Sequence, residues 1–198
     1  MRRVIIVHCW EGTPDFCWYS YAKRELEKLG FEVNVPAMPD TSTPRFIPWL
    51  TKLQEEIGSA SEELYLIGHS LGGPTIMKYL GTLAEGTKVG GVVFVAVPTD
   101  TLDEVAAIQD KSVLPEFFGD GINWNKVKES SKAFIGIYSD DDPYIDSRHA
   151  EVIKEKLGAE IITKHGLGHM SEPDGEGDIM VVKELPDVVE AIKKLAHV

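Results

Sequence analysis

Residues 63–80, ELYLIGHSLGGPTIMKYL, decide how this chain of 198 residues folds. The segment opens with an apolar run that has the length of a buried β-strand, and it continues into GPTIMKYL, which we interpret as a helix. Between the two, Gly68, Ser70 and Gly72 form a G-x-S-x-G motif. Glycines flank the serine because side chains there would collide with the strand and the helix. The segment therefore predicts a tight strand-to-helix turn that exposes the Ser70 hydroxyl above a sheet.

The rest of the chain alternates short apolar runs with amphipathic stretches. Several runs are continuously apolar, as expected for parallel strands that are covered on both faces. The predicted strands are 4–8, 31–35, 64–68, 91–97, 133–139 and 160–165. Apart from the helix after the motif, the predicted helices are 16–30, 47–58, 147–158 and 186–198. This alternation predicts a single α/β domain over residues 1–198, a three-layer α/β/α sandwich around a mostly parallel sheet of about six strands.

The charge balance excludes several classes of partner. The chain has 20 Lys and Arg against 32 Asp and Glu, which gives a formal net charge of −12. Such a field repels phosphate backbones and anionic lipids, so we expect neither a nucleic-acid nor a membrane partner. No apolar run approaches the ~20 residues that span a bilayer, and no signal-peptide pattern opens the chain. We therefore expect a cytoplasmic protein whose two cysteines, Cys9 and Cys17, are reduced thiols.

Ser70 is the candidate nucleophile. A G-x-S-x-G motif between a strand and a helix is typical of a nucleophile elbow, a strained turn that presents the serine to substrate. The elbow also aims the helix N-terminus at the site, so the Leu71 N–H can stabilise an oxyanion. The alternative interpretation is a serine that only caps a helix on a glycine-rich turn.

A serine nucleophile needs a base and an acid that orients the base. In folds with this elbow the chain order is Ser, then Asp or Glu, then His. His169 lies on a glycine-rich loop directly after the last predicted strand, so it is the candidate base. The run Asp140–Asp142 follows the preceding strand, and three adjacent carboxylates cannot all be buried cheaply. We take Asp142 as the acid because Pro143 fixes the turn after it, with Asp141 as the next candidate.

The loop after the first strand, HCWEGTPDF (8–16), is expected to supply the second oxyanion donor. The Trp10 N–H is the first candidate and the Cys9 N–H is the alternative. Among the aromatic residues we expect Trp10, Phe16 and Phe117 to line an apolar substrate pocket.

No cofactor or metal is expected. His165, His169 and the run Asp140–Asp142 could suggest a metal site. However, His-x-x-x-His binds a metal well on a helix, and the glycines at 166 and 168 make a helix improbable.

Segments spread over nearly the whole chain resemble the small α/β-hydrolase family that includes the retinoblastoma-binding serine hydrolase and its bacterial relatives. The segments are IIVHCWEG (5–12), FCWYSYAKREL (16–26), PAMPDTSTPRFIPWL (36–50), IGHSLGGPTIMKYL (67–80), WNKVKES (124–130), SDDDPYID (139–146) and GLGHM (166–170). The resemblance implies a minimal α/β-hydrolase fold with Ser70 as nucleophile, Asp142 as acid and His169 as base. It thereby favours Asp142 over Asp141.

The function expected is hydrolysis of a small carboxylic ester, neutral or cationic and partly apolar, through an acyl-enzyme on Ser70. With 198 residues, the chain leaves no insertion large enough for a lid domain. The alternatives are an amidase or aminopeptidase, and a non-catalytic protein-binding module on the same fold. Family relatives bind the retinoblastoma protein through an L-x-C-x-E segment before the nucleophile strand. This chain has EEIGSASEE (55–63) there, so retinoblastoma-protein binding is not expected.

Overall fold

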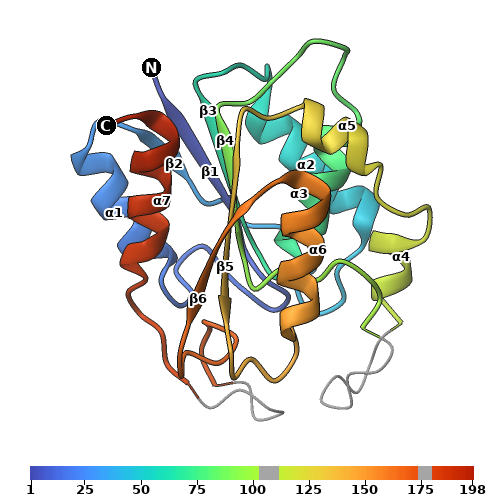
Figure 1. The fold of residues 1–198 in the computed structure, drawn as a ribbon, viewed down its shortest axis with the longest axis vertical. Coiled ribbons are helices and arrows are strands. Elements are labelled where there is room, and N and C mark those ends of the chain that lie inside the picture. Colours follow the sequence, from blue (N-terminus) through green and yellow to red (C-terminus); the bar gives the residue numbers. More distant parts are fainter. Residues whose placement is uncertain (103–111, 174–179) are drawn as a thin grey trace.

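The computed structural model describes residues 1–102, 112–173 and 180–198, which form one six-stranded sheet with helices on both faces (Figure 1). The strand order is β2-β1-β3-β4-β5-β6, and every pair of neighbours is parallel. The strands are β1 (Arg3–Val7), β2 (Glu32–Asn34), β3 (Leu64–His69), β4 (Gly91–Val95), β5 (Phe134–Ser139) and β6 (Glu160–Lys164). The predicted sheet of about six strands is confirmed, and it is parallel throughout.

The helices form the two outer layers of a sandwich. They are α1 (Tyr19–Lys28), α2 (Phe46–Ile57), α3 (Gly72–Gly81), α4 (Leu114–Phe118), α5 (Trp124–Glu129), α6 (Ser147–Leu157) and α7 (Pro186–Ala196). Helices α1 and α7 pack together on one face, while α2, α3, α5 and α6 cover the other (Figure 1). Within the described ranges, no helix is long and apolar enough to cross a membrane. The predicted three-layer arrangement is confirmed.

Burial on both faces explains the continuously apolar strands. Every residue of β3, β4 and β5 is buried, because helices cover both sides of the central strands. β6 is an edge strand with exposed and half-buried residues, so its sequence is more polar. Two helices end where the sequence predicts, at Gly58 and Gly158, whose positive φ angles of 62° and 70° suit a residue without a Cβ.

The fold differs from the sequence prediction between β4 and β5. Residues 98–131 are the least regular part of the sequence, and the structure has the short helices α4 and α5 there. Helices of five and six residues are too short to show a clear helical period in the sequence. Their position is set by packing against α3 and α6.

The strand order places a crevice at the carboxyl ends of β1 and β3. The chain leaves β1 toward β2 on one side, whereas β3 pairs with β1 on the other. In open parallel sheets ligands bind at such a switch in strand order. The loop after β1 and the turn after β3 both begin here, so the topology brings them together.

Candidate active site

The turn at Ser70 is as tight as the motif predicts. Ser70 has a positive φ of 48°, its N–H donates to the Val95 carbonyl at 2.9 Å, and its own carbonyl accepts from the Gly73 N–H at 2.9 Å. A Cβ atom at Gly72 would lie 2.2 Å from the carbonyl oxygen of Val7, so only glycine fits where α3 crosses β1. A non-glycine residue held in this conformation costs about 1–3 kcal/mol and is characteristic of functional turns.

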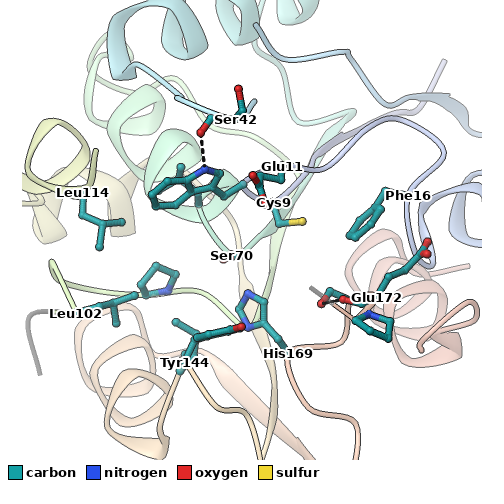
Figure 2. Close-up of a pocket in the computed structure, with 16 residues that line it drawn as sticks. Cys9, Glu11, Phe16, Ser42, Ser70, Leu102, Leu114, Tyr144, His169 and Glu172 are labelled. Atoms are coloured by element: carbon teal, nitrogen blue, oxygen red, sulfur yellow. Dashed lines mark hydrogen bonds between the residues drawn. The ribbon is translucent and has the colours of Figure 1, made fainter. Parts of the chain in front are cut away.

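Ser70 opens onto a cavity of about 490 Å³ (Figure 2). Leu71, Trp10, Phe16 and His169 also line it. The walls come from segments that follow each of the six strands, at the edge where parallel sheets carry their sites. Figure 2 shows the ring of His169 just below the label of Ser70.

His169 and Asp142 form a hydrogen-bonded pair behind the cavity wall. His169 Nδ1 donates to Asp142 Oδ2 at 2.9 Å, and the two side chains are 9% and 1% exposed. Asp142 Oδ1 accepts the N–H groups of Tyr144 and Ile145 at 2.9 and 3.0 Å. The carboxylate is buried, so these bonds hold it in place and compensate its charge. A proton on Nδ1 leaves the lone pair of the neutral ring on Nε2, the atom a base uses.

The other two carboxylates of the run have different partners. Asp141 Oδ1 accepts the Ser139 hydroxyl at 2.6 Å and the Gly168 N–H at 2.9 Å. The Ser139 bond is the main cause that lowers the Asp141 pKa. Asp140 lies at the surface and accepts from His165 Nδ1. Of the three carboxylates, the structure brings Asp142 to His169.

Two residues of the cavity wall carry the N–H groups that the sequence predicts as oxyanion donors. Leu71 and Trp10 both line the cavity. In the described part of the chain, neither of their N–H groups has a hydrogen-bond acceptor. The Cys9 N–H, the alternative donor, points away and donates to the buried Tyr19 hydroxyl at 3.0 Å. Trp10 therefore remains the candidate from this loop.

The apolar part of the wall differs from the prediction at one position. Trp10 and Phe16 line the cavity, but Phe117 does not belong to the described lining. Phe117 is fully buried on α4, and its ring packs edge-on against Trp49 at 5.8 Å. The pocket assignment of Phe117 is therefore corrected, because packing against α2 turns this ring into the core.

Sequence reasoning missed several apolar residues of the wall, among them Leu114 and Tyr144. Leu114 lies in the region without a clear pattern. Tyr144 follows the aspartate run, and its ring packs edge-on against His169 with centroids 5.1 Å apart. Its position directly after Asp142-Pro143 is the signal that could have identified it.

Two acidic residues, Glu11 and Glu172, complete the cavity (Figure 2). Glu172 accepts the Cys17 N–H at 3.0 Å and pairs with Lys183, the pairing that chiefly lowers its pKa. Among the described residues of the wall, none is Lys or Arg. The cavity therefore suits neutral or cationic molecules better than anions.

Three histidines are buried away from the cavity surface: His8, His69 and His149. His149 is fully buried near the start of α6 and accepts the Thr99 N–H at 3.1 Å. Burial lowers the pKa of all three, and that of His69 falls to about 3. In the described ranges, no group of three His, Cys, Asp or Glu side chains could hold a metal ion.

Acid is expected to destabilise the fold through these histidines. The folded-state pKa of His69 lies below the unfolded value of about 6.5, so the unfolded chain binds the proton more readily. The contribution of His69 is complete above pH ~6.5 and falls by about 1.4 kcal/mol per pH unit down to its folded pKa. Urea unfolding at several pH values between 7.5 and 5 measures this slope. In His69→Gln the unfolded chain should take up about one proton fewer, so stability should depend less steeply on pH. An unchanged slope would contradict the assignment.

The chain is similar to known serine hydrolases. The sequence pattern of the serine hydrolase family matches residues 4–185. The chain is 26% identical over 184 residues to the YdeN protein of Bacillus subtilis (strain 168), covering 93% of this chain and 94% of YdeN. It is 27% identical over 169 residues to the serine hydrolase RBBP9 of Rattus norvegicus, covering 85% and 86% of the two chains.

Solved structures show the same fold. The crystal structure of the ydeN gene product from B. subtilis matches with a TM-score of 0.88 at 24% identity, over 100% of both chains. Est1E from Butyrivibrio proteoclasticus matches with a TM-score of 0.74 at 13% identity, over 99% of this chain and 87% of Est1E. The parallel sheet, its helices and these likenesses fit a minimal α/β-hydrolase fold. The match of the family pattern over residues 4–185 shows that the chain belongs to the serine hydrolase family.

Proposed function

We propose that the protein hydrolyses small carboxylic esters through an acyl-enzyme on Ser70. The observation that carries this proposal is the buried Asp142–His169 pair, bonded at 2.9 Å, whose ring shares a cavity with the strained Ser70 turn. A serine hydroxyl is a poor nucleophile alone and becomes effective beside an oriented neutral imidazole. Membership in the serine hydrolase family supports hydrolysis as the reaction class. The Asp142–His169 pair supports His169 as the base and Asp142 as the acid.

In the proposed mechanism, His169 Nε2 removes the Ser70 proton as Oγ attacks the ester carbonyl. Asp142 holds the ring in the required tautomer and stabilises the imidazolium that forms. The N–H groups of Leu71 and Trp10 stabilise the negative charge that develops on the carbonyl oxygen. His169 then protonates the leaving alcohol. Water attacks the acyl-enzyme by the same route and regenerates Ser70.

The cavity supports a substrate that is small, partly apolar, and neutral or cationic. A volume of about 490 Å³ lies within the range for small-molecule sites. Trp10, Phe16 and Leu114 would contact an apolar acyl or alcohol group. Glu11 and Glu172 disfavour an anionic one.

A fluorophosphonate probe tests the nucleophile directly. The purified protein should be labelled at a single serine, identified as Ser70 by peptide mass spectrometry. Ser70→Ala should not be labelled, whereas Ser42→Ala, which removes another hydroxyl near the cavity, should be labelled like the wild type. A folded wild-type protein that resists the probe would favour the alternative of a binding module without catalysis.

A substrate panel separates the remaining enzyme classes. We expect p-nitrophenyl esters of short and medium acyl chains to be hydrolysed with a higher kcat/KM than aminoacyl anilides. The reverse order would show that the protein is an amidase or aminopeptidase. Retinoblastoma-protein binding is not part of the proposal.

A further inference from the structure

A buried series of hydrogen bonds joins the loops that form the cavity. The Cys9 N–H donates to Tyr19 Oη at 3.0 Å, and Tyr19 Oη lies 2.6 Å from His69 Nδ1. On the other side of the same ring, His69 Nε2 lies 2.9 Å from the backbone carbonyl oxygen of His169. Tyr19 and His69 are both 0% exposed. The series connects the loop after β1, the residue before Ser70, and the loop that carries His169.

The direction of each bond follows from its groups. The His169 carbonyl can only accept, so His69 Nε2 carries the proton and donates it. Burial keeps the His69 ring neutral, with a pKa of about 3, so Nδ1 is an acceptor for the Tyr19 hydroxyl. Burial also raises the pKa of Tyr19 well above its usual value, which keeps this donor protonated. The Tyr19 oxygen in turn accepts from the Cys9 N–H, and all of these polar groups are satisfied.

The position of these bonds matters for the reacting groups. His69 is adjacent to Ser70 in the chain, and the carbonyl that it holds belongs to His169 itself. The loop around His169 has Gly166 and Gly168 at positive φ angles of 70° and 52°, so its backbone is intrinsically adaptable. The two histidine rings pack with centroids 5.3 Å apart. Other bonds also hold this loop, such as the Gly168 N–H to Asp141 and the Trp18 indole to the Met170 carbonyl. The bond from His69 differs from them because it ties the loop to the residue next to Ser70.

We propose that His69 and Tyr19 are positioning residues, which hold the His169 imidazole at the distance from Ser70 that catalysis needs. Through Cys9 they also fix the position of the Trp10 N–H. This inference rests on the function proposed for Ser70 and His169. A displacement of about 1 Å between reacting groups can cost on the order of 100-fold in rate. A merely structural role predicts something different, namely a loss of stability with kcat unchanged.

The test compares His69→Leu with His69→Gln in ester hydrolysis. Leucine fills the space but donates no hydrogen bond, so kcat should fall by roughly 10- to 100-fold while KM changes little. The glutamine amide can place an N–H near the position of Nε2, so His69→Gln should recover most of kcat. Ser131→Ala is the matched control, because its buried hydroxyl donates to the Ala133 carbonyl at 3.0 Å beyond the amino end of β5. It should lower stability and leave kcat unchanged.

Tyr19→Phe extends the test along the series. It removes the donor to His69 Nδ1 and the acceptor for Cys9, so it should also lower kcat with little change in KM. Because both residues act through one series of bonds, Tyr19→Phe combined with His69→Leu should lose less than the product of the two single losses. If the double variant loses as much kcat as the product of the two single losses, the proposal is overturned. If His69→Leu does not fold, full kcat in Tyr19→Phe overturns it equally.

A measurement without substrate separates this inference from the proposed function. Amide hydrogen exchange at Gly168 and Met170, whose N–H groups bond to Asp141 and Leu167, reports the order of the base loop. Exchange there should accelerate in His69→Leu and stay unchanged in Ser131→Ala. If the wild type proves inactive while exchange responds in this way, the esterase proposal fails and the positioning contact stands. An active wild type whose kcat survives His69→Leu would refute the positioning role.

Discussion

Replacing Ser70 with alanine is expected to lower kcat for ester hydrolysis by about 10⁶-fold. The activity that remains would come from substrate binding and oxyanion stabilisation without the nucleophile. The reason for the loss is that, among the described residues of the cavity wall, Ser70 alone carries a hydroxyl on a strained turn between a buried strand and a helix N-terminus. Alanine keeps the Cβ of serine, so the positive φ of 48° strains the backbone of the variant about as much as that of the wild type. The fold should therefore persist. Initial rates with a p-nitrophenyl ester, together with thermal unfolding, measure both effects.

The matched control for this prediction is Ser42→Ala. Ser42 also lines the cavity, and its backbone carbonyl accepts from the Trp10 indole at 3.2 Å, a bond that the substitution retains (Figure 2). Its kcat should stay within about tenfold of the wild type, since no covalent step needs this hydroxyl. Substantial turnover by Ser70→Ala, with purity verified, would show that the hydrolysis uses a different nucleophile.

Asp142→Asn is expected to lower kcat by about 10⁴-fold with little loss of stability. An asparagine can keep its Oδ1 as acceptor for the N–H groups of Tyr144 and Ile145. Its amide nitrogen would then face His169 Nδ1 where a carboxylate oxygen now accepts at 2.9 Å. The ring would respond by carrying its proton on Nε2, which removes the lone pair that must take the Ser70 proton. Steady-state kinetics and a urea unfolding curve give the two readouts.

Asp141→Asn supplies the comparison. Asp141 uses Oδ1 to accept from the Ser139 hydroxyl and the Gly168 N–H, and asparagine retains that oxygen. The effect on kcat should therefore stay below about tenfold, because the base keeps its own partner. If the Asp141 variant were the crippled one, the acid would be misassigned by one residue.

Much of the fold was predictable because its signals are local. The apolar run, the glycines and the helical stretch of residues 63–80 are neighbours in the chain, and they dictate a strand, a tight turn and a helix. Long apolar runs identified the buried strands for the same reason, since burial on both faces leaves little room for polar residues. Where elements were short, as in α4 and α5, no local pattern existed to be read.

The order Ser70, Asp142, His169 was also available from the sequence, because each residue follows a strand at the same edge of the sheet. The sequence favoured Asp142 over Asp141, but the bond from the His169 ring to Asp142 and the different partners of Asp141 are visible only in the folded chain. The place of Phe117 is also visible only in the folded chain. Its aromatic side chain suits a pocket, but the structure buries it in the core against Trp49.

By itself, then, the sequence determined the parallel sheet, the turn at Ser70 and the family to which the chain belongs. Tertiary structure alone decided that the Cys9 N–H is taken by Tyr19, and that His69 joins the Ser70 turn to the loop of His169. The physical reason is distance along the chain. Strand and turn propensities act over a few residues, whereas the bond from His69 to His169 spans 100 positions and exists only once the sheet has aligned its loops.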